Sequence, residues 1–159
     1  MAKAPPEKET WVPRVRDAIK DRARWFALLY RSFCKYFPPD IVEQASREAI
    51  RKFGHLKAKE DGSEMSPLLW VEKHQKKGSA LIFESQITRG REACEQRMTY
   101  CPLVEAWKEI GCSKKEIDLF CDIAMEGDRG RAEKSGITLE ISSRIGKGES
   151  SCRLLLKKS

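Results

Sequence analysis

The sequence has 159 residues, of which 40% are hydrophobic and 35% are charged. This length and composition predict one domain with a hydrophobic core, and exclude a disordered chain. The formal net charge is +7, but acidic and basic residues are interleaved at helical spacing, as in Glu43 and Arg47, which indicates solvated helix faces. The longest apolar runs, such as residues 25–30, are far shorter than the roughly 20 residues that span a bilayer. We therefore expect neither a nucleic acid nor a membrane as partner.

The polar, proline-containing residues 1–10 predict a flexible arm, and residues 11–159 predict a single domain. The N-terminus lacks the apolar stretch of a secretory signal, so a cytoplasmic location and six reduced cysteines are expected. From Trp11 to Tyr36 the apolar residues recur with a helical period, with aromatic residues on one face. The sequence therefore predicts a long first helix.

A second helix is predicted for residues 41–53. Pro38 and Pro39 end the first helix, and Asp40 with Glu43 has the spacing of a capping box. Gly54 is the expected helix end, and the polar residues that follow predict a loop. Ser66 and Pro67 then provide an N-cap and a first helical residue for a short helix through Gln75, although residues 68–71 also fit an extended segment.

The rest of the chain predicts two hairpins separated by two helices. Residues 80–88 and 92–100 alternate as strands around a turn, and residues 137–142 and 152–156 do the same. Between the hairpins, Pro102 begins one helix and Ser113 with Glu116 caps another, followed by a flexible glycine-rich exit over residues 127–136. These elements predict an α+β fold, with an antiparallel sheet of about four strands, helices packed on one face and a helical N-terminal part.

Three cysteines occupy structural landmarks in the C-terminal third. Cys101 precedes the Pro102 helix, Cys121 lies midway along the next helix, and Cys152 lies in the last strand. A thiol at a helix N-terminus faces unpaired N–H groups and the positive end of the helix dipole, so we expect a lowered pKa for Cys101. The chain has no C-x-x-C spacing, so a metal site would have to be assembled from separate elements.

The order of these features resembles the C-terminal half of the L-2-amino-thiazoline-4-carboxylic acid hydrolase family. The residues that carry the resemblance are Cys101-Pro102, Cys121-Asp122, Glu140 and Gly148-Glu149-Ser150-Ser151-Cys152. A more distant likeness is to vinyl-4-reductase-type ligand-binding domains, some of which hold zinc, although serines replace cysteines around the last turn of this chain.

The resemblance implies hydrolytic ring opening of L-2-amino-thiazoline-4-carboxylate or a related small cyclic amidine, a reaction at a non-peptide C–N bond. The expected catalytic residues are Cys101, Asp122 and Glu140, and the expected substrate-binding residues are Arg97, Trp107 and Arg144. Cys101, Cys121 and Cys152 are the candidate ligands of a divalent metal such as zinc. The alternative is a non-catalytic module of the same fold that binds a small molecule or a metal. A homo-oligomer is a further expectation.

Overall fold

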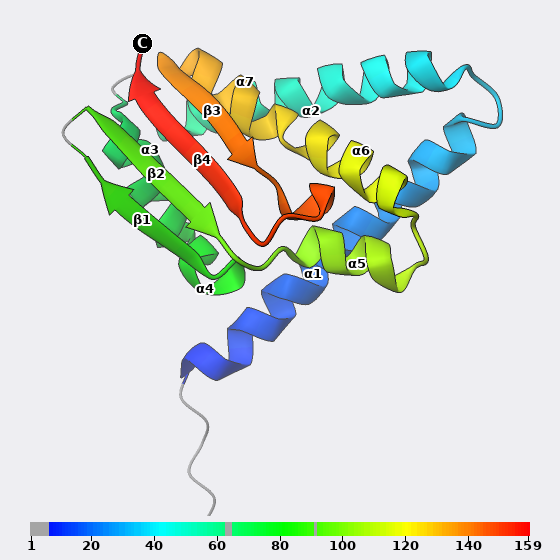
Figure 1. The fold of residues 1–159 in the computed structure, drawn as a ribbon, viewed down its shortest axis with the longest axis horizontal. Coiled ribbons are helices and arrows are strands. Elements are labelled where there is room, and N and C mark those ends of the chain that lie inside the picture. Colours follow the sequence, from blue (N-terminus) through cyan, green and yellow to red (C-terminus); the bar gives the residue numbers. More distant parts are fainter. Residues whose placement is uncertain (1–6, 63–64, 91) are drawn as a thin grey trace, which may run out of the picture.

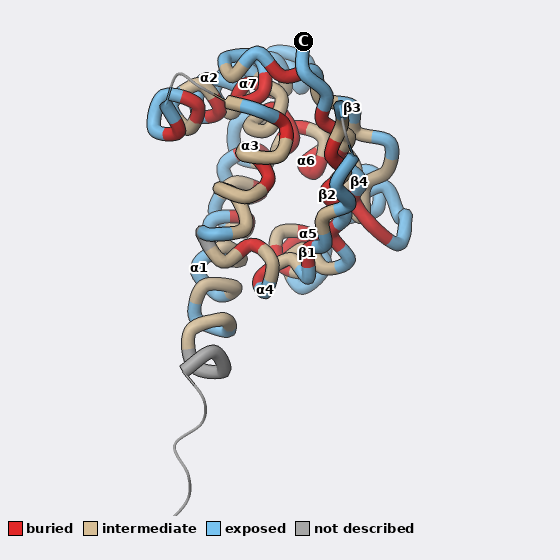
Figure 2. Tube along the Cα trace, turned by 90° about the vertical axis from the view of Figure 1, so that its left-hand side faces the viewer, coloured by how far each residue is buried: buried red, intermediate tan, exposed pale blue. Residues whose placement is uncertain are grey.

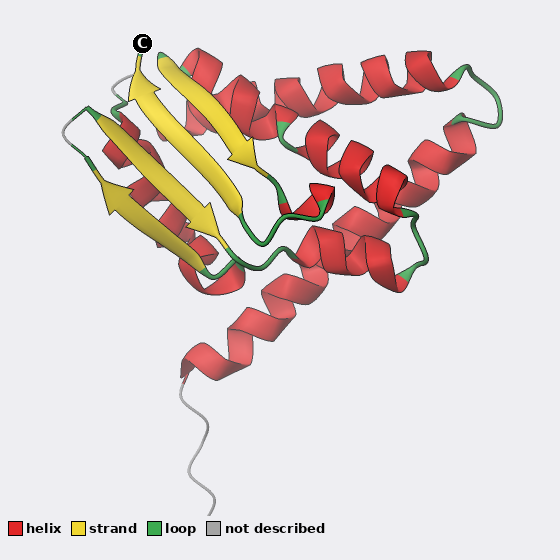
Figure 3. Ribbon diagram, in the orientation of Figure 1, coloured by secondary structure: helices red, strands yellow, loops and turns green. Residues whose placement is uncertain are grey.

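The computed structural model describes residues 7–62, 65–90 and 92–159. It has an α+β architecture in which helices pack behind a four-stranded antiparallel sheet (Figures 1 and 3). Residues 1–6 of the predicted arm lie outside the described residues, and the first helix, α1, spans Glu7–Phe33. Among the described residues, no helix combines the length and hydropathy that a membrane crossing requires.

The second helix, α2, spans Pro39–Asp61 and continues well past its predicted end. Pro38 occupies the N-cap position without a side-chain cap, so the predicted capping box of Asp40 and Glu43 is wrong. Gly54 does not end the helix. It lies where α2 crosses a later helix, and a Cβ atom at this position would come within 2.1 Å of the Gly127 carbonyl oxygen. Gly54 is therefore needed for close helix packing.

The segment before the sheet is more helical than the alternation of apolar residues predicts. Helix α3 spans Pro67–His74 and begins as predicted, with the Ser66 hydroxyl accepting from the Leu69 N–H at 3.1 Å. A segment kinked at Gly78, η1 (Gln75–Ser79), and a single helical turn, α4 (Ala80–Ile82), follow it. The first strand consequently begins at Ser85, and the prediction of a strand over residues 80–84 is wrong.

The sheet has the strand order β1-β2-β4-β3. Its strands are β1 (Ser85–Arg89), β2 (Ala93–Met98), β3 (Ile137–Ser143) and β4 (Cys152–Lys158), and all neighbouring pairs are antiparallel. Both predicted hairpins are confirmed. The last strand, β4, lies between its hairpin partner β3 and β2, which places residues of the first hairpin beside residues near the C-terminus.

Three helices connect the two halves of the sheet. Helix α5 spans Pro102–Glu109, and α6 spans Lys114–Ala124 with the predicted capping box of Ser113 and Glu116. The predicted flexible exit is wrong in its first part, because α7 spans Glu126–Lys134. The glycines of α7 allow it to lie close against α2, so tertiary packing rather than helix propensity explains this helix.

The interior consists of two hydrophobic clusters. The first lies between α1, α5 and α6 around Trp107 and Phe120, whose ring centroids are 5.6 Å apart. The second lies between α3, α7 and the inner face of the sheet around Trp70 and Leu154. Ile145 packs against both clusters. Figure 2 shows the sheet and α1 on opposite sides of the molecule, with this interior between them.

Candidate functional site

The turn between β3 and β4 brings two of the predicted thiols together. It contains a 3₁₀ turn, η2 (Ile145–Lys147), whose consecutive N–H groups face two sulfurs. The Ile145 N–H donates to Cys152 Sγ at 3.3 Å, and the Gly146 N–H donates to Cys121 Sγ. A Cβ atom on Gly146 would lie 2.6 Å from Cys121 Sγ, so only glycine permits this approach.

Cys101 lies close enough for its charge to interact with those of Cys121 and Cys152. It occupies the N-cap position of α5, near the Leu103 and Val104 N–H groups, although its side chain makes no capping hydrogen bond of good geometry. Cys121 belongs to the first hydrophobic cluster, against which the partly buried Cys101 packs, and Cys152 belongs to the second. The structure thus brings the three thiols to the junction of the two clusters.

Burial raises the pKa of these thiols. Desolvation raises the pKa of Cys101 to about 12 and outweighs the nearby N–H groups, and it raises the pKa of Cys152 to about 11. The pKa of Cys121 is also raised by burial, against the opposing effects of the Gly146 N–H and Arg144. The expected lowered pKa of Cys101 is therefore wrong, because the helix N-terminus is buried in apolar surroundings.

The same environment does not suit the predicted metal site. Zinc binds thiolates rather than thiols, and burial raises the pKa of these sulfurs, so a metal would have to displace their protons. Within residues 7–62, 65–90 and 92–159, no group of three or more His, Cys, Asp and Glu side chains has a geometry that could hold a metal ion.

The raised thiol pKa values predict a loss of stability at alkaline pH. Unfolded thiols lose their protons near pH 9, whereas the folded Cys101 retains its proton up to about pH 12, so the unfolded state binds fewer protons between these values. The free energy of unfolding must then fall as the pH rises. We expect the wild type to lose about 1 kcal/mol more than Cys101→Ala between about pH 9 and pH 10 in urea titrations. Parallel pH profiles of the two proteins would contradict a buried thiol.

Asp122 lies at the centre of an ion-pair network on α6. Its carboxylate is 2.8 Å from Arg129 Nη2, 2.8 Å from Arg47 Nη1 and 3.8 Å from Arg144 Nε. Burial alone raises the pKa of Asp122, but Arg129, Arg47 and Arg144 outweigh it and hold the pKa below its usual value. Asp122 therefore stays ionised, which does not suit the predicted role of proton donor.

Arg144 connects the β3–β4 turn to α6. Its Nη1 donates to the Asp118 carbonyl oxygen at 3.0 Å, its Nη2 pairs with Asp118 Oδ1 at 2.8 Å, and it also interacts with Cys121. Only 15% of its side chain is exposed. These contacts position the turn, so the guanidinium is largely engaged before any substrate arrives.

Two further predicted site residues lie away from the thiols. Glu140 is exposed and pairs in register with Leu155, whereas Cys152 and Leu154 are buried on the inner face. Because side chains alternate along a strand, Glu140 points to the opposite side of the sheet from Cys152. Trp107 is 1% exposed, and its Nε1–H donates to the Ala23 carbonyl oxygen at 2.9 Å. It belongs to the core, so its predicted contact with a substrate is not supported.

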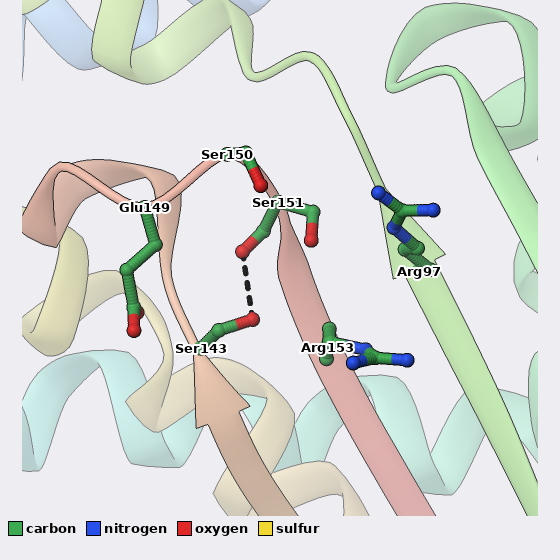
Figure 4. A pocket seen from close by; sticks show the side chains of 6 residues that line it. All are labelled: Arg97, Ser143, Glu149, Ser150, Ser151 and Arg153. Carbon is green, nitrogen blue, oxygen red and sulfur yellow. Dashed lines mark hydrogen bonds between the residues drawn. The ribbon is translucent and has the colours of Figure 1, made fainter.

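A polar hollow of about 530 Å³ lies on the outer side of the sheet, at the end of β3 and the start of β4. Figure 4 shows the six side chains that line it, which are Arg97, Ser143, Glu149, Ser150, Ser151 and Arg153. Arg97 was predicted for substrate binding, and the structure places it here because it alternates with the buried Gln96 and Met98 along β2.

Three residues of this hollow form one row across the sheet. Arg153 on β4 pairs in register with Arg97 on β2 and with Ser143 on β3. An irregularity between Ile141 and Ser143 shifts the register, as a β-bulge does, and the Ser143 hydroxyl donates to the Ser151 carbonyl oxygen at 2.8 Å. The row therefore combines two cations with a fixed hydroxyl.

Glu149 completes the hollow from the turn. Its Oε2 accepts from the Arg144 backbone N–H at 2.6 Å, and its own N–H donates to the Arg144 carbonyl oxygen at 3.3 Å. A second hollow of about 250 Å³ adjoins the first, because Ser143 and Glu149 line both. Asp122 and Arg144 line this second hollow. A small molecule with both an anionic and a cationic group would find opposite charges in these hollows.

Sequence reasoning assigned no role in the site to Ser143, Glu149, Ser150, Ser151 or Arg153. Glu149, Ser150 and Ser151 were among the residues that carry the family resemblance, and this was the available signal. Arg153 gave no signal, because its position opposite Arg97 depends on the insertion of β4 beside β2.

Comparison with solved structures identifies the class of fold. The chain is similar to a trafficking protein particle complex subunit 3 from Naegleria fowleri, solved covalently bound to palmitic acid, with a TM-score of 0.57 and 12% sequence identity. The similarity covers 88% of this chain and 96% of that one, and at this identity it shows a shared fold alone.

The chain belongs to the L-2-amino-thiazoline-4-carboxylic acid hydrolase family, whose model matches residues 14–156. This match confirms the family resemblance and extends it to the N-terminal helices. No curated protein matches the chain.

Proposed function

We propose that this protein hydrolyses L-2-amino-thiazoline-4-carboxylate, or a closely related cyclic amidine, bound in the hollow of Arg97, Arg153 and Glu149. The family match supports a hydrolase of this kind. The observation that carries the proposal is the pairing of Arg97 with Arg153 in register, in a hollow that a carboxylate and three serines also line. The substrate carries a carboxylate at one end and a basic amidine at the other, which matches this distribution of charge.

Arg97 is the better placed of the two arginines to bind the substrate carboxylate. Arg153 is already paired with Glu95 at 3.0 Å, whereas Arg97 forms no ion pair within the described part of the chain. Like charges directly opposite each other destabilise a sheet. An anion between the two guanidiniums would relieve this repulsion. The Arg97–Arg153 pair therefore favours binding of an anion at the expense of the stability of the sheet.

In the proposed reaction, water attacks the ring carbon of the amidine. The oxygen of water bonds to this carbon while Glu149 accepts a proton, and the tetrahedral adduct then collapses as the bond from this carbon to the ring nitrogen breaks. Glu149 returns the proton to the departing nitrogen. The hydroxyl proton of the adduct passes to the same nitrogen as the carbonyl forms, so one water molecule is consumed and the product is the S-carbamoyl derivative of the ring-opened amino acid, a thiocarbamate with a free amino group. The protonated thiols take no part in bond formation and serve to pack the β3–β4 turn.

The wild-type protein tests this proposal directly. Incubation with L-2-amino-thiazoline-4-carboxylate at neutral pH should give a product heavier by one water molecule, detected by mass spectrometry, at a rate well above that of buffer alone. The alternative, a non-catalytic binding module, predicts saturable binding of the same compound without conversion. An absence of both conversion and binding would overturn the proposal.

The six cysteines are free thiols in the structure. We place the protein in a reducing compartment such as the cytoplasm, where free thiols persist. Thiol titration of the denatured, anaerobically handled protein tests this assignment and should detect all six thiols.

A further inference from the structure

Helix α1 has apolar residues on two faces. Its inner face carries Ala23, Ala27 and Tyr30, which are buried in the first hydrophobic cluster. On its outer face, Trp25 is 69% exposed and Leu28 is 56% exposed. A surface helix needs one apolar stripe, and a helix that is apolar all round is normally buried. The outer face of the C-terminal half of α1 is therefore unexplained by the fold of a single chain.

This exposed surface continues around the end of the helix into α2. We define the α1–α2 corner by its large exposed apolar residues, which are Trp25, Leu28, Leu29, Phe33, Tyr36, Phe37 and Ile41. The Phe33 and Phe37 rings have centroids 6.5 Å apart, which joins the helix to the turn. Figure 1 shows this turn projecting from the right-hand end of the molecule. The corner is a continuous segment of chain rather than a set of scattered residues.

The corner is large enough for a stable interface. Its exposed fractions, applied to about 200 Å² for each large side chain, give an apolar area of about 800 Å². The largest apolar patch on a typical monomer is about 300–600 Å², and a standard interface buries about 800 Å² on each partner. The area thus exceeds the first value and meets the second.

The charges within and around the corner favour a second protein surface. The one charged residue between Trp25 and Phe33 is Arg31, whose partly exposed side chain is paired with Glu116 at 2.8 Å, so this stretch carries no unpaired charge. The exposed rim carries both signs, with Asp21 and Asp40 beside Arg22 and Lys35. Because the rim carries both signs, two copies related by a two-fold axis can match acidic and basic rim residues with each other.

We propose that the α1–α2 corner is the interface of a homodimer, with Trp25 near its centre. The turn of the corner lies at the opposite end of the molecule from the sheet (Figure 1), so dimerisation leaves the outer hollow of the sheet open. The dimer is independent of the proposed hydrolysis, and either can fail without the other.

Sedimentation equilibrium of the full chain tests the dimer. We expect the wild type to sediment as a dimer at micromolar concentration, and Trp25→Glu and Leu28→Glu each to raise the dimer dissociation constant by about 100-fold or more. The matched control is Leu81→Glu, which places the same charge at an exposed leucine on α4, outside the corner. This control should remain dimeric, and all three variants should retain the far-ultraviolet circular dichroism of the wild type.

Two results would overturn the proposal. One is a wild-type protein that stays monomeric throughout the micromolar range. A monomer that binds anionic phospholipid vesicles would count as this result. The other is a dimer whose dissociation constant is unchanged by both Trp25→Glu and Leu28→Glu, since that dimer must use another surface.

Discussion

Gly54→Ala is expected to lower the free energy of unfolding by about 3 kcal/mol. The new methyl group would lie 2.1 Å from the Gly127 carbonyl oxygen and 2.7 Å from the Arg131 nitrogen, which are backbone atoms that no rotamer change can move. The helices α2 and α7 would have to separate, and overpacking of this kind costs about 1–3 kcal/mol or more. Separation would also weaken the Arg131–Asp61 and Arg51–Glu126 ion pairs that cross this contact.

The same contact provides a matched control. A Cβ on Gly127 would meet only Ile50 and Phe53 atoms at 3.6 Å or more, which is ordinary packing distance. Gly127→Ala should therefore be neutral or stabilise the protein by up to about 1 kcal/mol, since alanine favours a helix more than glycine does. Urea unfolding of both variants measures the difference. Equal stabilities of Gly54→Ala and Gly127→Ala would show that the two helices do not approach this closely.

These glycines also mark the limit of prediction from sequence. Gly54, Gly127 and Gly130 suggest helix ends or flexible turns when only local conformational preferences are considered. In the structure each lies inside a helix, and at Gly54 and Gly130 an added Cβ would clash with the backbone or side chain of the opposing helix. A glycine required for close packing cannot be distinguished from a helix-ending glycine without knowledge of the partner helix.

Elements with local signals were predicted well. Ser113 with Glu116 and Ser66 with Pro67 satisfy nearby N–H groups, so their effect is contained within a few residues and is visible in the sequence. The alternating strands of both hairpins were found for the same reason. Residues 80–84 were not, because their alternation coincides with a helical turn that follows α3.

The candidate site shows the same division between local and long-range effects. The sequence pointed to the Cys121–Cys152 neighbourhood through the family resemblance, but the sign of the Cys101 pKa shift depends on burial by distant segments. Strand alternation puts the Glu140 side chain on the other face of its strand from Leu139 and Ile141, so the separation of Glu140 from the buried thiols was predictable. The pairing of Arg97 with Arg153 was not, because it requires the strand order of the whole sheet.

The kinetic effect of Arg97→Gln tests the central claim, that the outer hollow of the sheet binds the substrate carboxylate. Loss of this guanidinium removes a charged hydrogen bond to the substrate, so kcat/KM for L-2-amino-thiazoline-4-carboxylate should fall about 100-fold. The repulsion from Arg153 is removed at the same time, so the free energy of unfolding should stay unchanged or rise. A structural role for Arg97 would instead lower stability together with activity.

Arg89→Gln is the matched control, because Arg89 is an exposed strand arginine that lies outside the residues lining the hollow. The measurement is the ratio of kcat/KM between Arg97→Gln and Arg89→Gln, taken with the same substrate under the same conditions. We predict a ratio of about 1:100, with Arg89→Gln within about twofold of the wild type. Equal kcat/KM values for the two variants would contradict substrate binding in this hollow.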